Sequence, residues 1–240
     1  MTVYDGTTVL GTTAVTALGT WSLTPTLGNG THSITVKATD AAGNVSAASN
    51  ALALTIDTTA PGVPAFSGGN ATTLRGTGEA GDTVTILNGG AAVGTATVGS
   101  AGNWSWSFIA GSSPLAFTAL QTDKAGNVGS ATAGSALIGT SSNNTLISTG
   151  GNDLLVGAGG TDTFSFSGAF GKDIITDFAA TGAAHDFINL LGNGVLNSFA
   201  NVLAHTTQTA TGVVISDGTN TLTLNNVTKT SLTSADFSFA

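Results

Sequence analysis

The side chains best suited to chemistry in this sequence are carboxylates and amides that stand in glycine-rich turns. The chain has 13 Asp and Glu against five Lys and Arg, which leaves a formal net charge of −8. Oxygen ligands on flexible turns suit Ca²⁺ better than Mg²⁺, because Mg²⁺ demands a tighter octahedral geometry. Asp and Asn also favour turns for conformational reasons alone, so each acid keeps a structural explanation beside the metal-binding one.

Catalytic chemistry finds little support in the sequence. The three histidines, His32, His185 and His205, lie far apart and belong to no His-Glu-x-x-His zinc motif. No Gly-x-Ser-x-Gly elbow occurs, and the absence of cysteine removes thiol nucleophiles, zinc-thiolate sites and disulfides. A convergent Ser/His/Asp site stays open, but the sequence favours a protein that is not an enzyme.

The composition indicates a rigid, turn-rich β protein. Glycine accounts for 34 of 240 residues, while charged residues make up 8% and hydrophobic residues 41%, a balance that argues against disorder. The acidic surface argues against nucleic acid or anionic lipid as a partner, since both require clustered cations. No apolar run reaches the roughly 18 residues needed to span a bilayer, and no signal peptide opens the sequence.

An internal repeat organises the first half of the chain. A shift of 83 residues superimposes Gly6 on Gly89, Trp21 on Trp104, and the Thr39-Asp40 pair on Thr122-Asp123 without a gap. A common spacing across the whole unit indicates duplicated domains. The two tryptophans could stack on sugar rings, but their equivalence in the two repeats favours a packing role.

The repeated units have the pattern of short β-strands. Residues 33–38, 51–56 and 104–108 alternate polar and apolar side chains with a period of two, and turn residues separate such runs. Short strands at roughly ten-residue spacing in a unit of ~80 residues predict a β-sandwich. The expected domains are residues 1–57 and 58–138, followed by a different region, 139–240.

Residues 2–138 resemble the bacterial immunoglobulin-like repeats of large biofilm adhesins. The resemblance rests on the Asp57-Thr-Thr-Ala-Pro61 connector, the Thr-Asp-x-Ala-Gly-Asn loop and the Gly-x-Trp-Ser turn. One departure matters: the first unit lacks a counterpart of residues 62–83, or about two strands. Either the sequence begins within a domain, or another chain supplies a strand by β-augmentation.

A calcium site is expected in the second sandwich. The loop that holds Asp123 joins the last two strands of this domain, and the turn that precedes Thr83 is expected at the same end by alternation of antiparallel strands. Carboxylates and an amide would then converge beside the connector; the ligands would be Asp57, Glu79, Asp82, Asp123 and Asn127. Asp40 occupies the equivalent position in the first unit, and both loops also read as ordinary hairpin turns.

Residues 139–165 divide into the nonapeptides GTSSNNTLI, STGGNDLLV and GAGGTDTFS. They resemble the calcium-binding repeats-in-toxin pattern, which implies a short parallel β-roll with each nonapeptide forming half a turn. In such a roll Asn144 and Asp162 would face one ion, and Asp153 would pair with the turn that contains Asp173. Asn144 lacks the expected charge, so its site should be weak.

The remainder of the chain resembles the C-terminal β cap and uncleaved export signal of type I secretion substrates. Residues 198–205 predict a short helix capped by Ser198. Residues 213–216 and 221–224 predict two strands joined through Asp217-Gly218. The fold class expected for the whole chain is all-β: sandwich repeats, then a short parallel β-roll with its cap.

These resemblances imply a secreted, calcium-binding surface adhesin or biofilm-matrix protein. Its calcium-gated region would fold after export by the type I secretion machinery, because calcium is scarce inside the cell. Two alternatives stay open: an S-layer or filament subunit that is completed by strand exchange with other copies of itself, and the non-catalytic C-terminal region of a secreted hydrolase. The sequence names no surface ligand.

Overall fold

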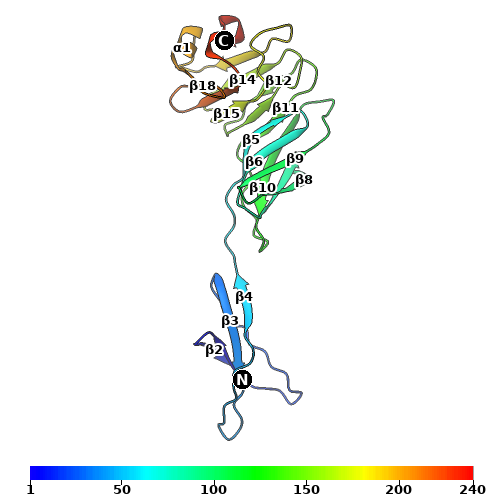
Figure 1. The fold of residues 1–240 in the computed structure, drawn as a ribbon, viewed down its shortest axis with the longest axis vertical. Helices are drawn as coiled ribbons and strands as arrows, with labels where there is room; N and C mark the ends of the chain where they lie inside the picture. The colour runs from blue at the N-terminus through cyan, green and yellow to red at the C-terminus, as the bar shows by residue number, and fades with distance from the viewer. Residues whose placement is uncertain (240) are drawn as a thin grey trace. The chain divides into compact units, whose positions relative to one another are not determined.

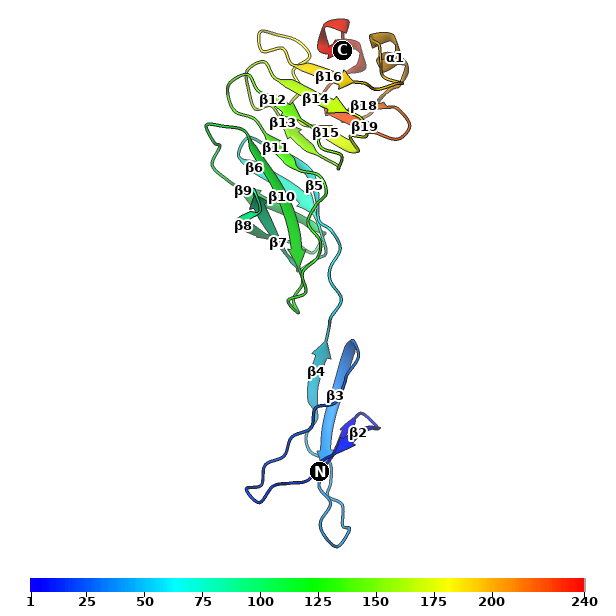
Figure 2. The same cartoon turned by 180° about the vertical axis from the view of Figure 1, so that it is seen from behind.

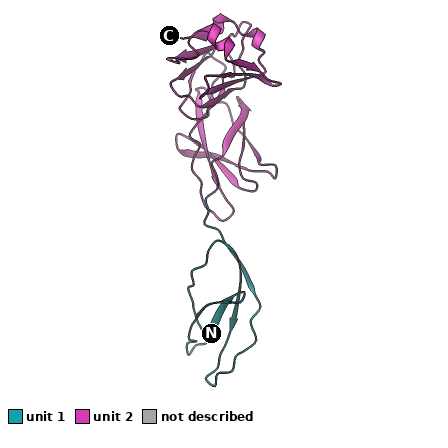
Figure 3. Cartoon of the chain, turned by 90° about the vertical axis from the view of Figure 1, so that its left-hand side faces the viewer, with its two compact units in different colours: residues 1–60 teal, residues 61–240 magenta. Residues whose placement is uncertain are grey.

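The computed structural model describes residues 1–239 and divides the chain into two compact units, one formed by residues 1–60 and the other beginning at Pro61. Figure 3 colours the two units separately. Strands are the main regular secondary structure of both, as the alternating sequence pattern predicts. No helix among the described residues is long and apolar enough to cross a membrane.

The first unit is a single antiparallel sheet with strand order β2-β1-β3-β4 (Figure 1). Its strands are β1 (Thr2–Asp5), β2 (Thr8–Thr12), β3 (Gly30–Lys37) and β4 (Leu52–Ile56). Val3 is the one hydrophobic residue of this unit that is fully buried. The unit therefore has a sheet but hardly a core.

The second unit opens with a two-layered sandwich. One layer is the three-stranded sheet β5-β6-β9, and the other is one end of a nine-stranded sheet, β10-β7-β8. The strands are β5 (Ala65–Asn70), β6 (Thr73–Thr77), β7 (Thr83–Asn88), β8 (Ala91–Thr97), β9 (Asn103–Ser107) and β10 (Leu115–Thr122). Their inward residues, including Leu74, Ile86 and Trp104, form a fully buried core.

The 83-residue repeat predicted from the sequence has a structural counterpart. The β1–β2 hairpin contains a bulge between Val3 and Tyr4. The β7–β8 hairpin contains one between Ile86 and Leu87, the positions that the 83-residue shift makes equivalent. The Asp loops match as well: Thr39 bridges Val45, and Thr122 bridges Val128. The two units thus share the geometry of this hairpin and of the Asp loop.

Residues 136–191 form parallel strands that alternate between two sheets. These strands are β11 (Ala136–Ile138), β12 (Thr145–Ile147), β13 (Leu154–Val156), β14 (Thr163–Ser167), β15 (Lys172–Ile175) and β16 (Phe187–Leu191). Each strand pairs with the strand two places later in the chain. In one sheet β12 pairs with β14 and β14 with β16; in the other β11 pairs with β13 and β13 with β15. This is the pairing of repeat n with repeat n+2 that the nonapeptides predict.

Strand β13 connects the sandwich to the parallel region. Leu155 points into the core of the parallel region, whereas Leu154 and Val156 belong to the core of the sandwich. Because both faces are covered, the strand is apolar at three successive positions instead of alternating. Strand β11 pairs with β10 on one edge and with β13 on the other. One nine-stranded sheet therefore contains strands of both the sandwich and the parallel region.

The C-terminal part closes the parallel region, as Figure 2 shows from behind. It contains α1 (Phe199–Ala204), β17 (Thr206–Gln208), β18 (Gly212–Ser216), β19 (Thr221–Asn225), two short 3-10 turns (Lys229–Ser231 and Ser234–Asp236) and β20 (Phe237–Ser238). The Ser198 hydroxyl accepts a hydrogen bond from the Asn201 backbone N–H, so the predicted helix cap is confirmed. The predicted strands on either side of Asp217-Gly218 are confirmed as the antiparallel pair β18–β19.

Candidate functional site

A ladder of acidic side chains runs along one edge of the parallel region, immediately before β12, β14 and β16. The strand register places Asn144, Asp162 and Asp186 directly after one another. The Asn144 backbone N–H donates to Asp162 Oδ1 at 2.8 Å, and the Asp162 N–H donates to Asp186 Oδ1 at 2.8 Å. Each carboxylate therefore accepts the backbone N–H of the preceding coil.

A second ladder precedes the strands of the other sheet. The backbone N–H of Ser135 donates to Asp153 Oδ1 at 2.5 Å, and that of Asp153 donates to Asp173 Oδ1 at 2.8 Å. The predicted pairing of Asp153 with the Asp173 turn is present in this geometry. Ser148 Oγ lies 3.0 Å from Asp153 Oδ2 and 2.7 Å from Asp173 Oδ2. A hydroxyl has one hydrogen to donate, so these two carboxylates compete for it.

Three carboxylates of the ladders have raised pKa values. Burial raises the pKa of Asp173 to about 7, and the charge of nearby Asp153 adds to the rise. Burial likewise raises the pKa of Asp162 to about 6, with further contributions from the charges of Asp186 and Asp177. Burial is also the main cause of the raised pKa of Asp186. The ionised form of these groups is disfavoured here, which is the state that a bound cation would stabilise.

The oxygen-only donor set suits a hard cation such as calcium, but the ladders hold acids in pairs. Across residues 1–239 no three Asp, Glu or His side chains group closely enough to hold a metal ion. Asn144 and Asp162 are adjacent, as predicted, yet Asn144 Oδ1 accepts hydrogen bonds from the backbone N–H and hydroxyl of Thr140. Calcium ligation by Asn144, Asp153, Asp162 and Asp173 stays a prediction.

Sequence reasoning missed two members of these ladders, Ser135 and Asp186, and the nearby acid Asp177. Asp177 accepts the backbone N–H groups of Gly157 and Ala158. Ser135 could have been found: residues 130–138, SATAGSALI, continue the nonapeptide frame backwards, with Ser135 at position six and Leu137 at position eight. Asp186 could not, because an insertion between β15 and β16 breaks the nine-residue count.

The ligands predicted in the second sandwich are held by local hydrogen bonds. The pairing of Thr83 with Thr122 places Asp82 and Asp123 at the same end of β7 and β10, as strand alternation predicts. Asp82 Oδ2 accepts from Gln121 Nε2 at 2.9 Å, and Glu79 Oε1 accepts from the Gly62 N–H at 2.6 Å.

The Asp-Ala-Gly-Asn loops form closed turns. Asp123 accepts both the backbone N–H and the side-chain amide of Asn127 at 2.8 Å, and the amide contact is the main cause of its lowered pKa. Asp40 makes the same pair of contacts with Asn44. In the first unit, Asp57 Oδ1 accepts the Thr59 N–H. These contacts account for the acids as turn residues, and calcium at this end of the sandwich stays a prediction.

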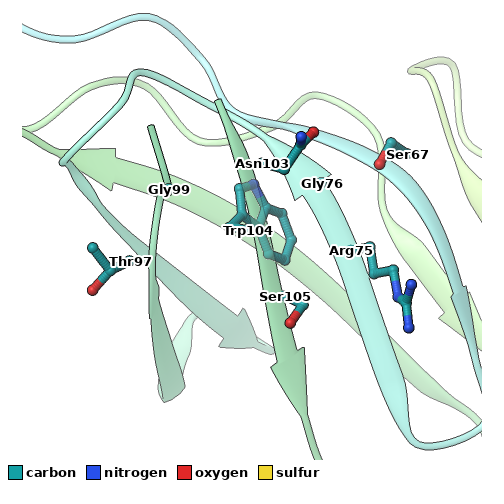
Figure 4. Close-up of a pocket in the computed structure, with 8 residues that line it drawn as sticks. All are labelled: Ser67, Arg75, Gly76, Thr97, Gly99, Asn103, Trp104 and Ser105. Atoms are coloured by element: carbon teal, nitrogen blue, oxygen red, sulfur yellow. The ribbon is translucent and has the colours of Figure 1, made fainter. Parts of the chain in front are cut away.

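A polar groove of about 610 Å³ lies over the β5-β6-β9 sheet (Figure 4). The chain's single arginine, Arg75, and Ser105 occupy neighbouring positions on β6 and β9. Trp104, also on β9, has 3% of its surface exposed. None of the eight residues that line the groove is acidic or a histidine. Trp104 Nε1 donates to the Thr77 carbonyl at 3.1 Å, which confirms a packing role for this tryptophan.

The histidines serve as local anchors. His32 Nδ1 lies 2.6 Å from Asp5 Oδ2 and its Nε2 lies 2.9 Å from the Gly28 carbonyl. His185 Nε2 contacts the buried carboxylate of Asp236, which also caps the last 3-10 turn. His205 Nδ1 lies 2.8 Å from the Asn201 carbonyl. Each contact ties a loop or a helix end to its neighbour.

One curated relative, exoglucanase A from Cellulomonas fimi, is 51% identical over 69 residues, which cover 26% of this chain and 8% of that enzyme. The chain therefore spans a small fraction of that relative's length.

Two solved structures are similar at low sequence identity. Fibronectin(III)-like modules of Clostridium thermocellum CbhA match with a TM-score of 0.37 and 16% identity, over 57% of this chain and 75% of that one. The extracellular lipase LipA from Serratia marcescens matches with a TM-score of 0.32 and 20% identity, over 51% of this chain and 29% of that one.

Two family models match consecutive parts of the chain. Residues 1–58 match a bacterial Ig-like domain and residues 60–137 match a bacterial Ig domain. These matches agree with the repeat, with the sandwich and with the equivalent bulges. Residues 1–137 therefore comprise two bacterial immunoglobulin-like domains.

Proposed function

We propose that this chain is the non-catalytic, calcium-responsive part of a secreted bacterial surface protein. In this proposal the immunoglobulin-like domains act as spacers and the parallel region acts as a fold that calcium completes. An extracellular place agrees with the immunoglobulin-like domains and with the exoglucanase relative.

The observation that carries the proposal is the pair of carboxylates around Ser148. Asp153 Oδ2 and Asp173 Oδ2 both lie within 3.0 Å of the single Ser148 hydroxyl, and both residues are almost completely buried. Backbone N–H groups of Ser135 and Thr149 also donate to Asp153, and that of Asp153 donates to Asp173. Two buried negative charges this close together are still costly unless a proton or a cation compensates them. Bound calcium would supply that positive charge and would accept oxygen ligands in irregular geometry.

In this proposal, charge repulsion between the carboxylates of each ladder controls whether the parallel region folds. At low calcium, Asp153 and Asp173 repel each other in one ladder, and Asp162 and Asp186 repel each other in the second. Repulsion opposes the close approach of successive coils and holds the region open during export. When the charges are neutralised outside the cell, the backbone N–H groups of each coil bond to the next and the apolar strands close over their core, so binding free energy becomes folding free energy.

The test is the thermal unfolding of the full chain in EDTA and in about 2 mM calcium, a concentration suited to extracellular sites. We expect calcium to raise the midpoint of the unit that begins at Pro61 and to increase its β signal by circular dichroism. The double variant Asp153→Asn, Asp173→Asn should lose this gain. Asp40→Asn, in the first unit, is the matched control and should keep it. Identical melting of the wild type in EDTA and calcium would refute the proposal.

Adhesion and export by a type I secretion system extend the same proposal. The resemblance of residues 139–165 to a repeat array, and of the residues after them to a cap and an export signal, motivates the export route. Deleting residues 232–240 from the chain in a host with a type I secretion system should abolish its appearance in the medium. Unchanged export of the shortened chain would exclude this route.

A second candidate is an accessory region of a secreted hydrolase. The relative that favours it is an exoglucanase, and the matched segment is a small part of that enzyme. In this case the chain would separate or position a catalytic domain without acting on substrate itself. A binding assay on insoluble cellulose tests the form of this candidate that holds the enzyme on its substrate: retention of the full chain favours it, and complete recovery in the wash excludes that form.

A further inference from the structure

The first unit exposes one face of its sheet as a large apolar surface. Trp21, Leu52 and Leu54 are 39%, 64% and 38% exposed. Together with Leu10 and Ile34 they border a groove of about 420 Å³, whose lining contains no charged residue. A monomeric domain of 60 residues rarely leaves so much of its inner face open, and a contiguous patch of this kind marks an interaction surface.

The second immunoglobulin-like domain shows what covers this face. Trp104, the equivalent of Trp21, is 3% exposed. Ile34 pairs with Leu52 in the first unit and its equivalent Phe117 pairs with Ala136 in the second, and Ala136 is completely buried. The cover is the β5–β6 hairpin, which places Leu74 at the centre of the sandwich core. The first unit has no strands in that position.

The backbone of residues 20–24 also indicates that a strand is missing from the first unit. In the second domain residues 103–107 form β9, which lies at the edge of its sheet and pairs with β6 alone. In the first unit the equivalent residues, 20–24, form no strand, although the turn before them keeps the same hydrogen bonds: Gly19 to the Thr16 carbonyl, and Gly102 to the Gly99 carbonyl. Residues 20–24 therefore follow the same turn as β9 but lack the strand partner that β6 provides to β9.

The tryptophan sets a condition on that partner. In the second domain Gly76 of β6 pairs with Trp104, and a Cβ built on Gly76 would lie 2.2 Å from the indole ring. A strand that covers Trp21 in the same way must carry glycine opposite the ring, with an apolar residue two positions earlier, as Leu74 precedes Gly76. Because the lining of the groove contains no charged residue, the partner residues that face the groove should also be apolar.

We propose that the open face of the first unit binds a β-hairpin of the β5–β6 type from outside these 240 residues, with one strand paired to residues 20–24 and a glycine opposite Trp21. A second copy of the chain is a poor donor, because lending its own β5–β6 hairpin would uncover Trp104 to cover Trp21. Burial of the exposed leucines and Trp21, together with a new strand pair, stabilises the complex. The proposal does not depend on calcium.

The experiment uses the full chain in EDTA and a synthetic peptide of residues 62–83 as the probe. Saturation with peptide should reduce quenching of the accessible tryptophan by acrylamide several-fold and raise the unfolding midpoint of the first unit. A second measurement uses the chain with an additional copy of residues 62–83 placed directly before Met1, where the effective concentration of the hairpin reaches the millimolar range. This fusion should show both effects without free peptide.

The controls test the chemistry of the hairpin. A Gly76→Val peptide or fusion should fail because its side chain meets the indole, and a Leu54→Asp chain should fail because it places a charge in the groove. Failure of both the peptide and the fusion to protect Trp21 would overturn the proposal. Equal protection by the Gly76→Val hairpin would also overturn it, as would concentration-dependent self-association of the chain that Leu54→Asp abolishes.

Discussion

The two immunoglobulin-like domains share a sequence pattern and local geometry but differ in how completely they are built. Both contain the same bulge, the same Asp-Asn turn and an equivalent tryptophan. The second domain buries that tryptophan under the β5–β6 hairpin, whereas the first leaves it 39% exposed. Turns and hairpins therefore form from local sequence, but the core of a sandwich requires its second sheet.

The largest difference between the domains should appear when the equivalent tryptophans are truncated. Trp104→Ala should destabilise the second unit by about 3–5 kcal/mol, because it empties a fully buried site and leaves the Thr77 carbonyl unpaired. Trp21→Ala should cost the first unit about 1 kcal/mol or less, since little packing is lost. Chemical denaturation measures both. Equal losses would show that the first unit buries Trp21 in solution.

Leu154→Ala tests whether the sandwich and the parallel region unfold together. Leu154 lies on β13 but packs into the sandwich core, so its truncation should cost about 2–5 kcal/mol and lower the transition reported by Trp104 and Trp106. The matched variant in the first unit, Leu52→Ala, removes an exposed side chain and should change stability by about 0.5 kcal/mol or less. If the tryptophan transition keeps its midpoint in Leu154→Ala, the two regions are independent.

The second unit should also differ from the first in its response to pH. The pKa of Asp173, about 7 when folded, lies above its ordinary value of 3.8, so the folded state binds the proton more tightly than the unfolded state. In chelator, its contribution to stability is complete below about pH 4 and is lost as the pH rises to about 7. Asp173→Asn should flatten this decline, as followed by denaturation at each pH. A wild-type stability that rises across the window would contradict the assignment.

The first unit should show a smaller pH effect centred on His32. Its hydrogen bond to Asp5 raises the pKa of His32 above 6.5, and the same contact lowers the pKa of Asp5. The stability that His32 contributes is complete below its unfolded pKa and is lost as the pH rises through the raised value. His32→Gln should remove this dependence from the unfolding of the first unit. Because the pair is partly exposed to solvent, 0.5 M salt should weaken it further.

Much of the fold follows from the sequence alone because its signals are local. Alternation with period two predicts β3, β4 and β9, the Ser198 hydroxyl predicts the start of α1, and the nonapeptide frame predicts that β12 pairs with β14. The 83-residue shift predicts two equivalent domains. Each signal depends on residues that are close in sequence or regularly spaced, so no knowledge of distant contacts is needed.

Tertiary structure alone decides the rest. The sequence cannot show that β11 pairs with β10 and β13 together, that Leu154 and Leu155 face different cores, or that Asp186 extends a ladder begun by Asn144. It determines which acids stand in turns, but whether two of them share the Ser148 hydroxyl depends on coils 25 residues apart, from Ser148 to Asp173. Burial and charge proximity are properties of packed elements, and they decide which carboxylates are strained and which merely close a turn.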